Sequence, residues 1–230
     1  MRKLLIAAAV LIAVLVAADR IAVAAAENQI GARVAATYGL PDKPRVAIAG
    51  FPFLTQVVTG DYRQISVHAT GVQAGGATLR WLSARLTGVH VSLPQVLGHG
   101  AGTVTASRAT GSALIGFAEL DQRLPPGVRL SQAGHRLRVS GELSEGGVRL
   151  PVSATVALRV TPVGIQIASR AVRTAGRRLP VYLARRYLPR LSFDIPLRTL
   201  PLHLRVTSVA VTSAGLRIGA SAHDVHFAAN

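Results

Sequence analysis

The sequence predicts a β-dominated α+β fold built from long, curved antiparallel strands. Hydrophobic and polar residues alternate along much of the chain, most regularly from Val148 to Thr161. A period of two is typical of strands that bury one face, and a single buried face favours antiparallel over parallel pairing. The sequence shows no strand–helix–strand rhythm and no exact internal repeat, so we expect one continuous sheet system.

Shorter stretches of the same alternation predict further strands and the turns between them. They include Val46/Ile48, Ile65/Val67, Val89/Val91, Val104/Ala106, Leu137/Val139, Val163/Ile165/Ile167, Leu202/Leu204/Val206 and Leu216/Ile218. The phase slips between Val206 and Val209, which predicts a β-bulge or a bend at that point. Glu145-Gly146-Gly147 and Ser213-Ala214-Gly215 have the composition of hairpin turns.

Three segments are predicted to be helical. The first runs from about Asp19 to Tyr38. The second, from Ser112 to Arg123, starts with a good capping residue and is followed by Pro125-Pro126. The third, from Pro180 to Tyr187, begins with a proline that suits the first helical position, and Pro189 lies just beyond its end.

The N-terminus predicts export. Arg2 and Lys3 precede an unbroken apolar run from Leu4 to Ala18, the pattern of a signal peptide. The alternative is an uncleaved membrane anchor that continues into a helix. Small residues up to Ala18 and up to Ala26 offer two cleavage positions. Positive charge ahead of the run places the N-terminus in the cytoplasm and the rest outside in both cases. We assign residues 1–26 to a signal peptide or anchor and residues 27–230 to a single domain.

The charge of the chain predicts an anionic partner. The sequence has 26 Lys and Arg against 10 Asp and Glu, a formal net charge of +16, and such a surface attracts anionic headgroups, nucleic acid or acidic glycans. Only 4% of the residues are aromatic and they are scattered, whereas nucleic-acid modules interleave aromatic with basic residues. We therefore expect no nucleic-acid partner. The lack of cysteine excludes disulfides and thiolate metal sites.

The sequence offers no catalytic constellation, so we expect a protein that is not an enzyme and has no cofactor. It contains no Gly-x-Ser-x-Gly elbow and no phosphate-binding P-loop. The cluster His223-Asp224-Val225-His226 most resembles a metal motif. In a regular strand its two histidines point to opposite faces, so we expect a solvated strand and no metal site.

Two other segments have the composition of a lipid contact. The loop of Phe51, Pro52, Phe53 and Leu54 is apolar and lies between predicted strands, so it either plugs the core or lines a lipid entrance. The predicted helix near residue 180 carries Tyr182 and Tyr187 among arginines that suit anionic headgroups; the alternative is an ordinary solvated helix face. These arginines are Arg177, Arg178, Arg185, Arg186 and Arg190.

Several stretches, taken in order, resemble a known family. Asp19-Arg20 ends the apolar run, and Gly50-Phe51-Pro52-Phe53-Leu54-Thr55-Gln56 is the most specific stretch. Phe193 to Leu197 and Leu200-Pro201 follow in the C-terminal part. Over nearly its whole length the chain resembles the LmeA-like phospholipid-binding family of actinobacterial envelope proteins, formerly a domain of unknown function.

This resemblance implies a long curved antiparallel sheet wrapped around a helix, similar to tubular lipid-binding domains. It implies a periplasmic or cell-envelope protein, anchored or secreted, that binds or transfers phospholipid. It also implies a role in lipoglycan and mannan assembly, beside envelope biosynthesis proteins. The alternative that stays open is a non-catalytic scaffold or accessory subunit of an envelope-polymer enzyme.

Overall fold

The computed structural model describes residues 1–74, 77–91, 102–122, 124, 127–134, 136–145, 148–161, 164–174, 177–178, 193–196 and 205–229. These residues form two compact units. Unit 1 comprises Met1–Gly71, Leu82–Gly111 and Ala222–Asn230, and unit 2 comprises Val72–Trp81 and Ser112–Ser221. The prediction of a single domain from residue 27 onward stays a prediction.

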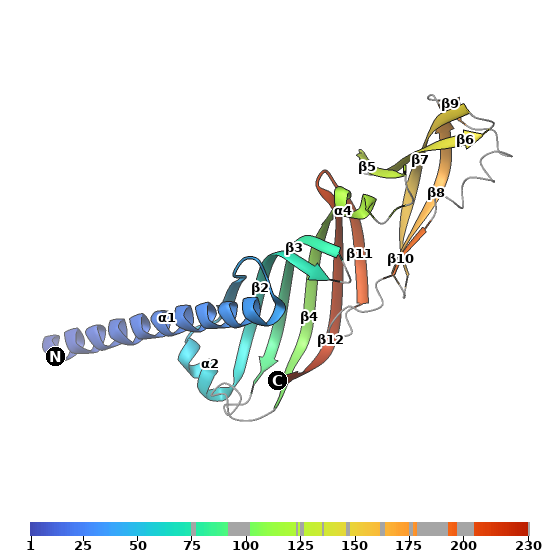
Figure 1. Ribbon diagram of the computed structural model, residues 1–230. Coiled ribbons are helices and arrows are strands. Elements are labelled where there is room, and N and C mark those ends of the chain that lie inside the picture. The colour runs from blue at the N-terminus through green and yellow to red at the C-terminus, as the bar shows by residue number, and fades with distance from the viewer. Residues whose placement is uncertain are drawn as a thin grey trace. The chain divides into compact units, whose positions relative to one another are not determined.

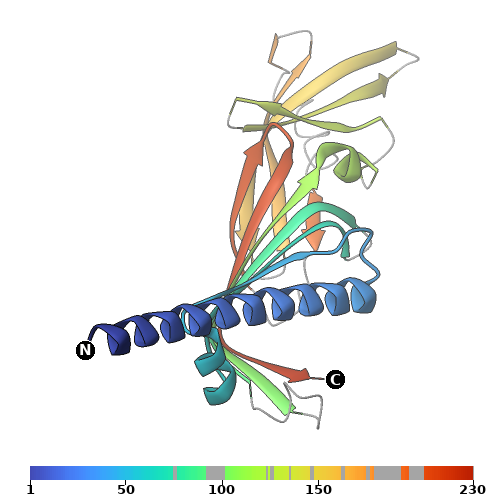
Figure 2. The same cartoon turned by 90° about the vertical axis from the view of Figure 1, so that its left-hand side faces the viewer.

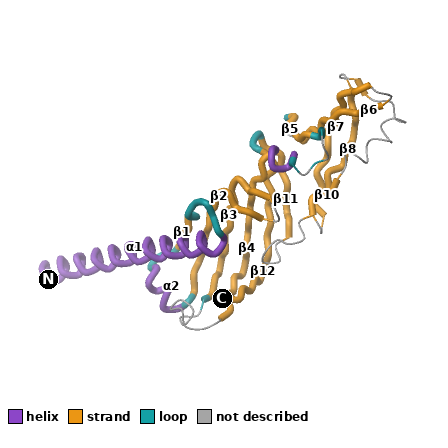
Figure 3. The backbone as a smooth tube through the Cα atoms, in the orientation of Figure 1, coloured by secondary structure: helices purple, strands orange, loops and turns teal. Residues whose placement is uncertain are grey.

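The first sheet has six strands in the order β1-β2-β3-β4-β12-β11 (Figures 1 and 3). Its strands are β1 (Arg45–Ala49), β2 (Asp61–Ala74), β3 (Ala77–His90), β4 (Gly102–Gly116), β11 (Arg205–Thr212) and β12 (Gly215–Ala229). β1 pairs antiparallel with β2, and β11 pairs antiparallel with β12. The register of β11 shifts between Val206 and Ser208, which confirms the predicted bulge.

The second sheet lies within unit 2 and has the order β10-β8-β7-β6-β5. Its strands are β5 (Arg129–Ala133), β6 (Arg136–Glu145), β7 (Val148–Thr161), β8 (Gly164–Thr174) and β10 (Phe193–Pro196). All of its neighbouring strands are antiparallel. β7 confirms the strand predicted from Val148 to Thr161, and Glu145 pairs with Val148 across the predicted hairpin. The β-dominated, antiparallel α+β class is confirmed.

The long helix α1 (Arg2–Tyr38) covers one face of the unit 1 strands with its second half (Figure 2). Its Val23 joins a buried cluster with residues from β1, β2, β3, β4 and a short helix. The other members are Ile48, Phe53, Tyr62, Val89 and Ala106. Figure 1 shows the first half of α1 projecting beyond the sheet. The helix is thus longer than the predicted one, which began at Asp19.

The short helix α2 (Phe53–Thr59) connects β1 to β2 and ends at Gly60. Gly60 has a φ of 76°, a backbone conformation that side chains with a Cβ rarely adopt. A Cβ there would lie 2.3 Å from the carbonyl oxygen of Val91, and the Val91 N–H donates to the Gly60 carbonyl at 2.8 Å. The close backbone approach at the start of β2 therefore requires glycine.

The helix predicted from Ser112 to Arg123 is wrong over its first half. β4 continues to Gly116, and only Phe117–Asp121 form a helix, α4. Leu114 and Ile115 are both buried, and the pairing of β4 with its neighbours replaces the hydrogen bonds that a helix beginning at Ser112 would make. The helix predicted from Pro180 to Tyr187 lies outside the described residues.

Candidate functional site

The structure separates the two phenylalanines of the apolar loop. Phe53 is 5% exposed and lies 6.4 Å, between ring centroids, from Tyr62 in the core of unit 1. Phe51 is 53% exposed and Leu54 is 44% exposed, and Pro52 between the phenylalanines is also exposed. The loop plugs the core with one aromatic ring and presents the other to the surroundings.

A carboxylate from α1 holds this loop in place. Asp19 is buried, and its Oδ1 accepts a hydrogen bond of 2.9 Å from the backbone N–H of Leu54. Leu54 belongs to the first turn of α2, and no side chain caps that helix from the Pro52 position. Asp19 therefore satisfies an N–H that would otherwise lack a partner at the helix start.

The environment of Asp19 favours its ionised form. Burial raises the pKa of the Asp19 carboxyl. This increase is smaller than the combined decrease from the hydrogen bonds that Arg20 and the backbone N–H groups of Leu54 and Phe53 donate and from the charge of Arg20. The net result is a pKa below the ordinary value. Asp19 is thus a fixed negative charge at the junction of α1 and α2.

Arg20 connects this junction to the exposed ring. Its Nη2 donates to Asp19 Oδ2 at 2.6 Å, and half of the Arg20 side chain is exposed. Its guanidinium carbon lies 5.3 Å from the centroid of the Phe51 ring, within the range of a cation–π interaction. The exposed ring is therefore held beside an exposed cation.

Apolar residues continue from this point along α2. Val58 is 70% exposed and follows Leu54 by four residues, so the two share one face of the helix. Phe53 and Gln56 face the interior instead. We call the group of Arg20, Phe51, Leu54 and Val58 the α1–α2 surface. It combines one guanidinium with three exposed apolar side chains.

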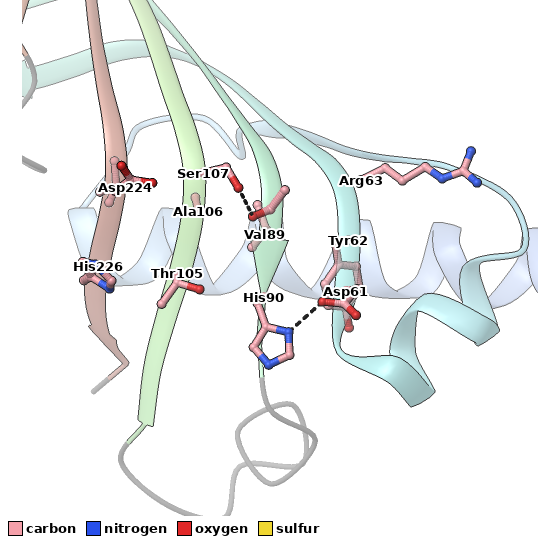
Figure 4. Close-up of a pocket in the computed structure, with 12 residues that line it drawn as sticks. Asp61, Tyr62, Arg63, Val89, His90, Thr105, Ala106, Ser107, Asp224 and His226 are labelled. Atoms are coloured by element: carbon pink, nitrogen blue, oxygen red, sulfur yellow. Dashed lines mark hydrogen bonds and ion pairs between the residues drawn. The ribbon is translucent and has the colours of Figure 1, made fainter.

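A second feature is an open hollow of about 740 Å³ on the strands of unit 1. Figure 4 shows its side chains in front of the strands, with α1 behind them. Its polar lining consists of Asp61, Arg63, His90, Thr105, Ser107, Asp224 and His226. His90 Nδ1 lies 2.7 Å from Asp61 Oδ1, and both residues are exposed. The Ser107 hydroxyl donates to the Gly88 carbonyl at 3.5 Å.

The C-terminal histidines do not follow regular strand alternation. Asp224 has a φ of 50°, and on either side of it Ala222 and Val225 are both buried although they are three residues apart. His223 and His226 are both exposed, as expected for a solvated strand, and His226, but not His223, lines the hollow. Within the described part of the chain, no three His, Asp or Glu residues are grouped as metal ligands.

The predicted arginine and tyrosine cluster falls mostly outside the described residues. Arg177 and Arg178 form β9, whose backbone pairs with Thr174 and Arg173 of β8. Their side chains, together with Tyr182, Tyr187, Arg185, Arg186 and Arg190, are not among the parts that the structure describes. Their role as headgroup or lipid contacts therefore stays a prediction.

Sequence reasoning missed the part that α1 has in the site. From the sequence, Asp19 and Arg20 mark only the end of the apolar run, and Val58 does not stand out. The available signal was a carboxylate and a guanidinium side by side directly after that run. Such a charged pair at the end of an apolar segment can fix a neighbouring element, but its partner, the N–H of Leu54, is visible only in the structure.

The open antiparallel sheet and the exposed apolar surface beside a cation fit a lipid-binding protein. The chain belongs to the LmeA-like phospholipid-binding family, whose model matches residues 17–221. The match begins inside α1, just before Asp19, and includes the whole α1–α2 surface. Family membership supports binding of lipid, and of phospholipid in particular. Comparisons with curated proteins and with solved structures found no match.

Proposed function

We propose that this chain is an exported cell-envelope protein that binds phospholipid at the α1–α2 surface and is not an enzyme. The observation that carries the proposal is the exposure of Phe51 and Leu54 beside Arg20, fixed there by the buried Asp19. Exposed large apolar side chains that are held in place, rather than scattered, are typical of interaction sites.

The α1–α2 surface matches the two parts of a phospholipid. An acyl chain laid against Phe51, Leu54 and Val58 is removed from water, which stabilises the complex by roughly 25 cal/mol per Å² of apolar area buried. The guanidinium of Arg20 keeps N–H groups available on its exposed side and donates well to phosphate oxygens. The net charge of +16 favours anionic phospholipids further.

Export and the place in the envelope rest on the N-terminal segment and on the family. Arg2 and Lys3 before the apolar run orient the rest of the chain outward. In that compartment, a protein that takes up phospholipid can carry it to enzymes that assemble lipoglycan. The absence of a catalytic motif from the sequence supports a binding role rather than a catalytic one.

Native mass spectrometry of the full chain released from detergent tests this proposal. We expect phospholipid adducts on the wild type, and a several-fold loss of them in Phe51→Asp and Leu54→Asp. Val160→Asp is the matched control, because Val160 is also an exposed large apolar residue but lies on β7. It should keep the adducts.

Equal amounts of phospholipid adduct in the wild type and all three variants would show that phospholipid binds somewhere other than the α1–α2 surface. A wild type that carries no lipid and does not bind anionic liposomes would contradict phospholipid binding altogether. That second outcome would favour the non-catalytic scaffold.

A further inference from the structure

The helix α1 passes without interruption through both positions at which the sequence offers cleavage. It runs from Arg2 to Tyr38 and ends at Gly39, which adopts a left-handed conformation. Ala18 and Ala26 are therefore both in helical backbone. In the folded chain neither position lies in an exposed, irregular segment of the kind that proteases cut in folded domains.

The second half of α1 is part of the folded core. Val23 is 8% exposed and belongs to the buried cluster, with Ala22 and Ala26 packed against it. Glu27 accepts a hydrogen bond of 2.8 Å from the backbone N–H of Ile48 in β1. A Cβ on Gly31 would lie 2.8 Å from the Pro44 carbonyl oxygen, so the helix packs closely on that segment.

Removal of residues 1–26 would therefore damage the fold. It would take away the packing of Ala22, Val23 and Ala26 and the Asp19 carboxylate that holds α2. Cleavage after Ala18 would require the helix to unwind next to Asp19, whose side chain is buried and doubly hydrogen-bonded.

The first half of α1, in contrast to the packed second half, is apolar and exposed. Its large side chains from Leu4 to Val16 are exposed, between 39% and 76%, and an 18-residue window of the helix has a mean hydropathy of 2.5. A surface of this kind is unfavourable in water and favourable in a bilayer. Arg2 and Lys3 lie at one end of the apolar run and Arg20 at the other, which suits headgroups on both sides.

The apolar run is short for a bilayer. At roughly 1.5 Å per residue, the 15 residues from Leu4 to Ala18 rise about 22 Å, about 8 Å less than a hydrocarbon core of about 30 Å. Ile21, which is 71% exposed, extends the apolar side of the helix. A short segment of this kind is accommodated by local thinning of the bilayer and by flanking basic side chains, here Arg2 and Lys3, that extend to the headgroups.

We infer that α1 is an uncleaved membrane anchor: Leu4 to Ala18 lie in the bilayer, and Asp19 to Tyr38 complete the folded domain. The partner of the exposed half is the lipid bilayer itself. Because one continuous helix serves both purposes, no flexible linker separates membrane and domain. The α1–α2 surface, which begins at Arg20, is then held at the membrane interface.

The first test is the N-terminus of the mature protein. The full chain with a C-terminal tag is expressed in cells that export it, and its intact mass and N-terminal peptide are measured. We expect a protein that begins at Met1 or Arg2 and stays in the membrane fraction after an alkaline wash. A mature N-terminus at Asp19 or Glu27 would overturn the inference. This result does not depend on whether phospholipid binds at the α1–α2 surface.

A pair of variants tests whether the second half of α1 stays packed in the mature protein. Val23→Asp places a charge in the buried cluster, whereas Ala24→Asp places it on the exposed side of the same helix. We expect the exported Val23→Asp protein to be degraded much faster by added protease than Ala24→Asp, which should match the wild type. Equal resistance of the two variants would show that this segment is absent from the mature fold.

Discussion

Phe51 and Phe53 flank the same proline, yet only Phe53 is buried. The sequence alone left open whether this loop plugs the core or meets lipid, because two phenylalanines around a proline fit either role. The packing of Phe53 against Tyr62 places that ring in the core, whereas Phe51 is exposed beside Arg20 and its contact with lipid is our proposal. At this scale, stability and binding can be separated by single substitutions.

The two phenylalanines form a matched pair for that separation. Phe53→Ala removes a buried aromatic side chain and should lower the free energy of unfolding by about 3–5 kcal/mol. Phe51→Ala should change it by less than about 1 kcal/mol, because half of that side chain is exposed, yet it should reduce phospholipid retention. Denaturant titration and lipid extraction of each variant measure the two effects. Equal stability losses would contradict the assignment.

The lowered pKa of Asp19 predicts that the stability of the folded protein depends on pH. Asp19 has a lowered pKa in the folded protein, so its contribution to stability is fully present above the ordinary pKa of an aspartate, about 4. That contribution is lost as the pH falls through the lower folded value. Asp19→Asn should have a lower thermal unfolding midpoint than the wild type at pH 7, and the difference should shrink at pH 3. A constant difference would show that the Asp19 charge is not what stabilises the junction.

At the scale of elements, regular alternation was a sound guide and local capping signals were not. β7, the bulge in β11 and the β6–β7 hairpin were all predicted, since a long one-faced pattern has few other solutions. The helix predicted at Ser112 was wrong because strand pairing from distant residues prevailed over a good capping residue. The connection from Asp19 to Leu54 spans 35 residues, and no local pattern encodes such a contact.

Two glycines that end helices test the contact between the end of α2 and Val91, the residue that follows β3. Gly39 after α1 and Gly60 after α2 both have positive φ, but only at Gly60 would an added Cβ lie within 4 Å of a neighbouring atom. Gly39→Ala should cost about 1 kcal/mol for the left-handed conformation alone. Gly60→Ala should cost distinctly more, because the Val91 carbonyl must also move. Chemical denaturation of both variants measures the difference, and similar costs would mean that the contact is relaxed.

At the scale of the whole molecule, α1 contributes to the core and to the candidate site, and we infer that it also attaches the chain to the membrane. The sequence predicted an export segment and a domain that starts after it, because an apolar run and a folded domain are normally separate. An uncleaved anchor that continues into a helix was one of two alternatives, and the sequence could not decide between it and cleavage, since the alanine-rich stretch from Ile21 to Ala26 looks like the end of a signal peptide. The buried cluster shows that it is also a packing surface.

Two truncations distinguish these contributions. A chain that begins at Asp19 keeps every packing residue of α1 and should remain folded and become soluble without detergent. A chain that begins at Glu27 loses Asp19, Ala22, Val23 and Ala26 and should lose its cooperative thermal transition in circular dichroism. If both truncations show the same thermal transition, the folding of the domain does not depend on residues 19–26 of α1.

The central claim, that phospholipid lies against the α1–α2 surface, is tested most directly by site-specific photo-crosslinking of the protein after purification in detergent, which removes bilayer lipid that is not bound to the chain. A benzoylphenylalanine is placed at Phe51 in the full chain, and at Val160 in a control, and the illuminated proteins are digested and analysed by mass spectrometry. We predict an adduct with the mass of an intact phospholipid on the peptide that contains position 51, and none at position 160. Phospholipid that co-purifies with the chain but never crosslinks at position 51 would contradict the account.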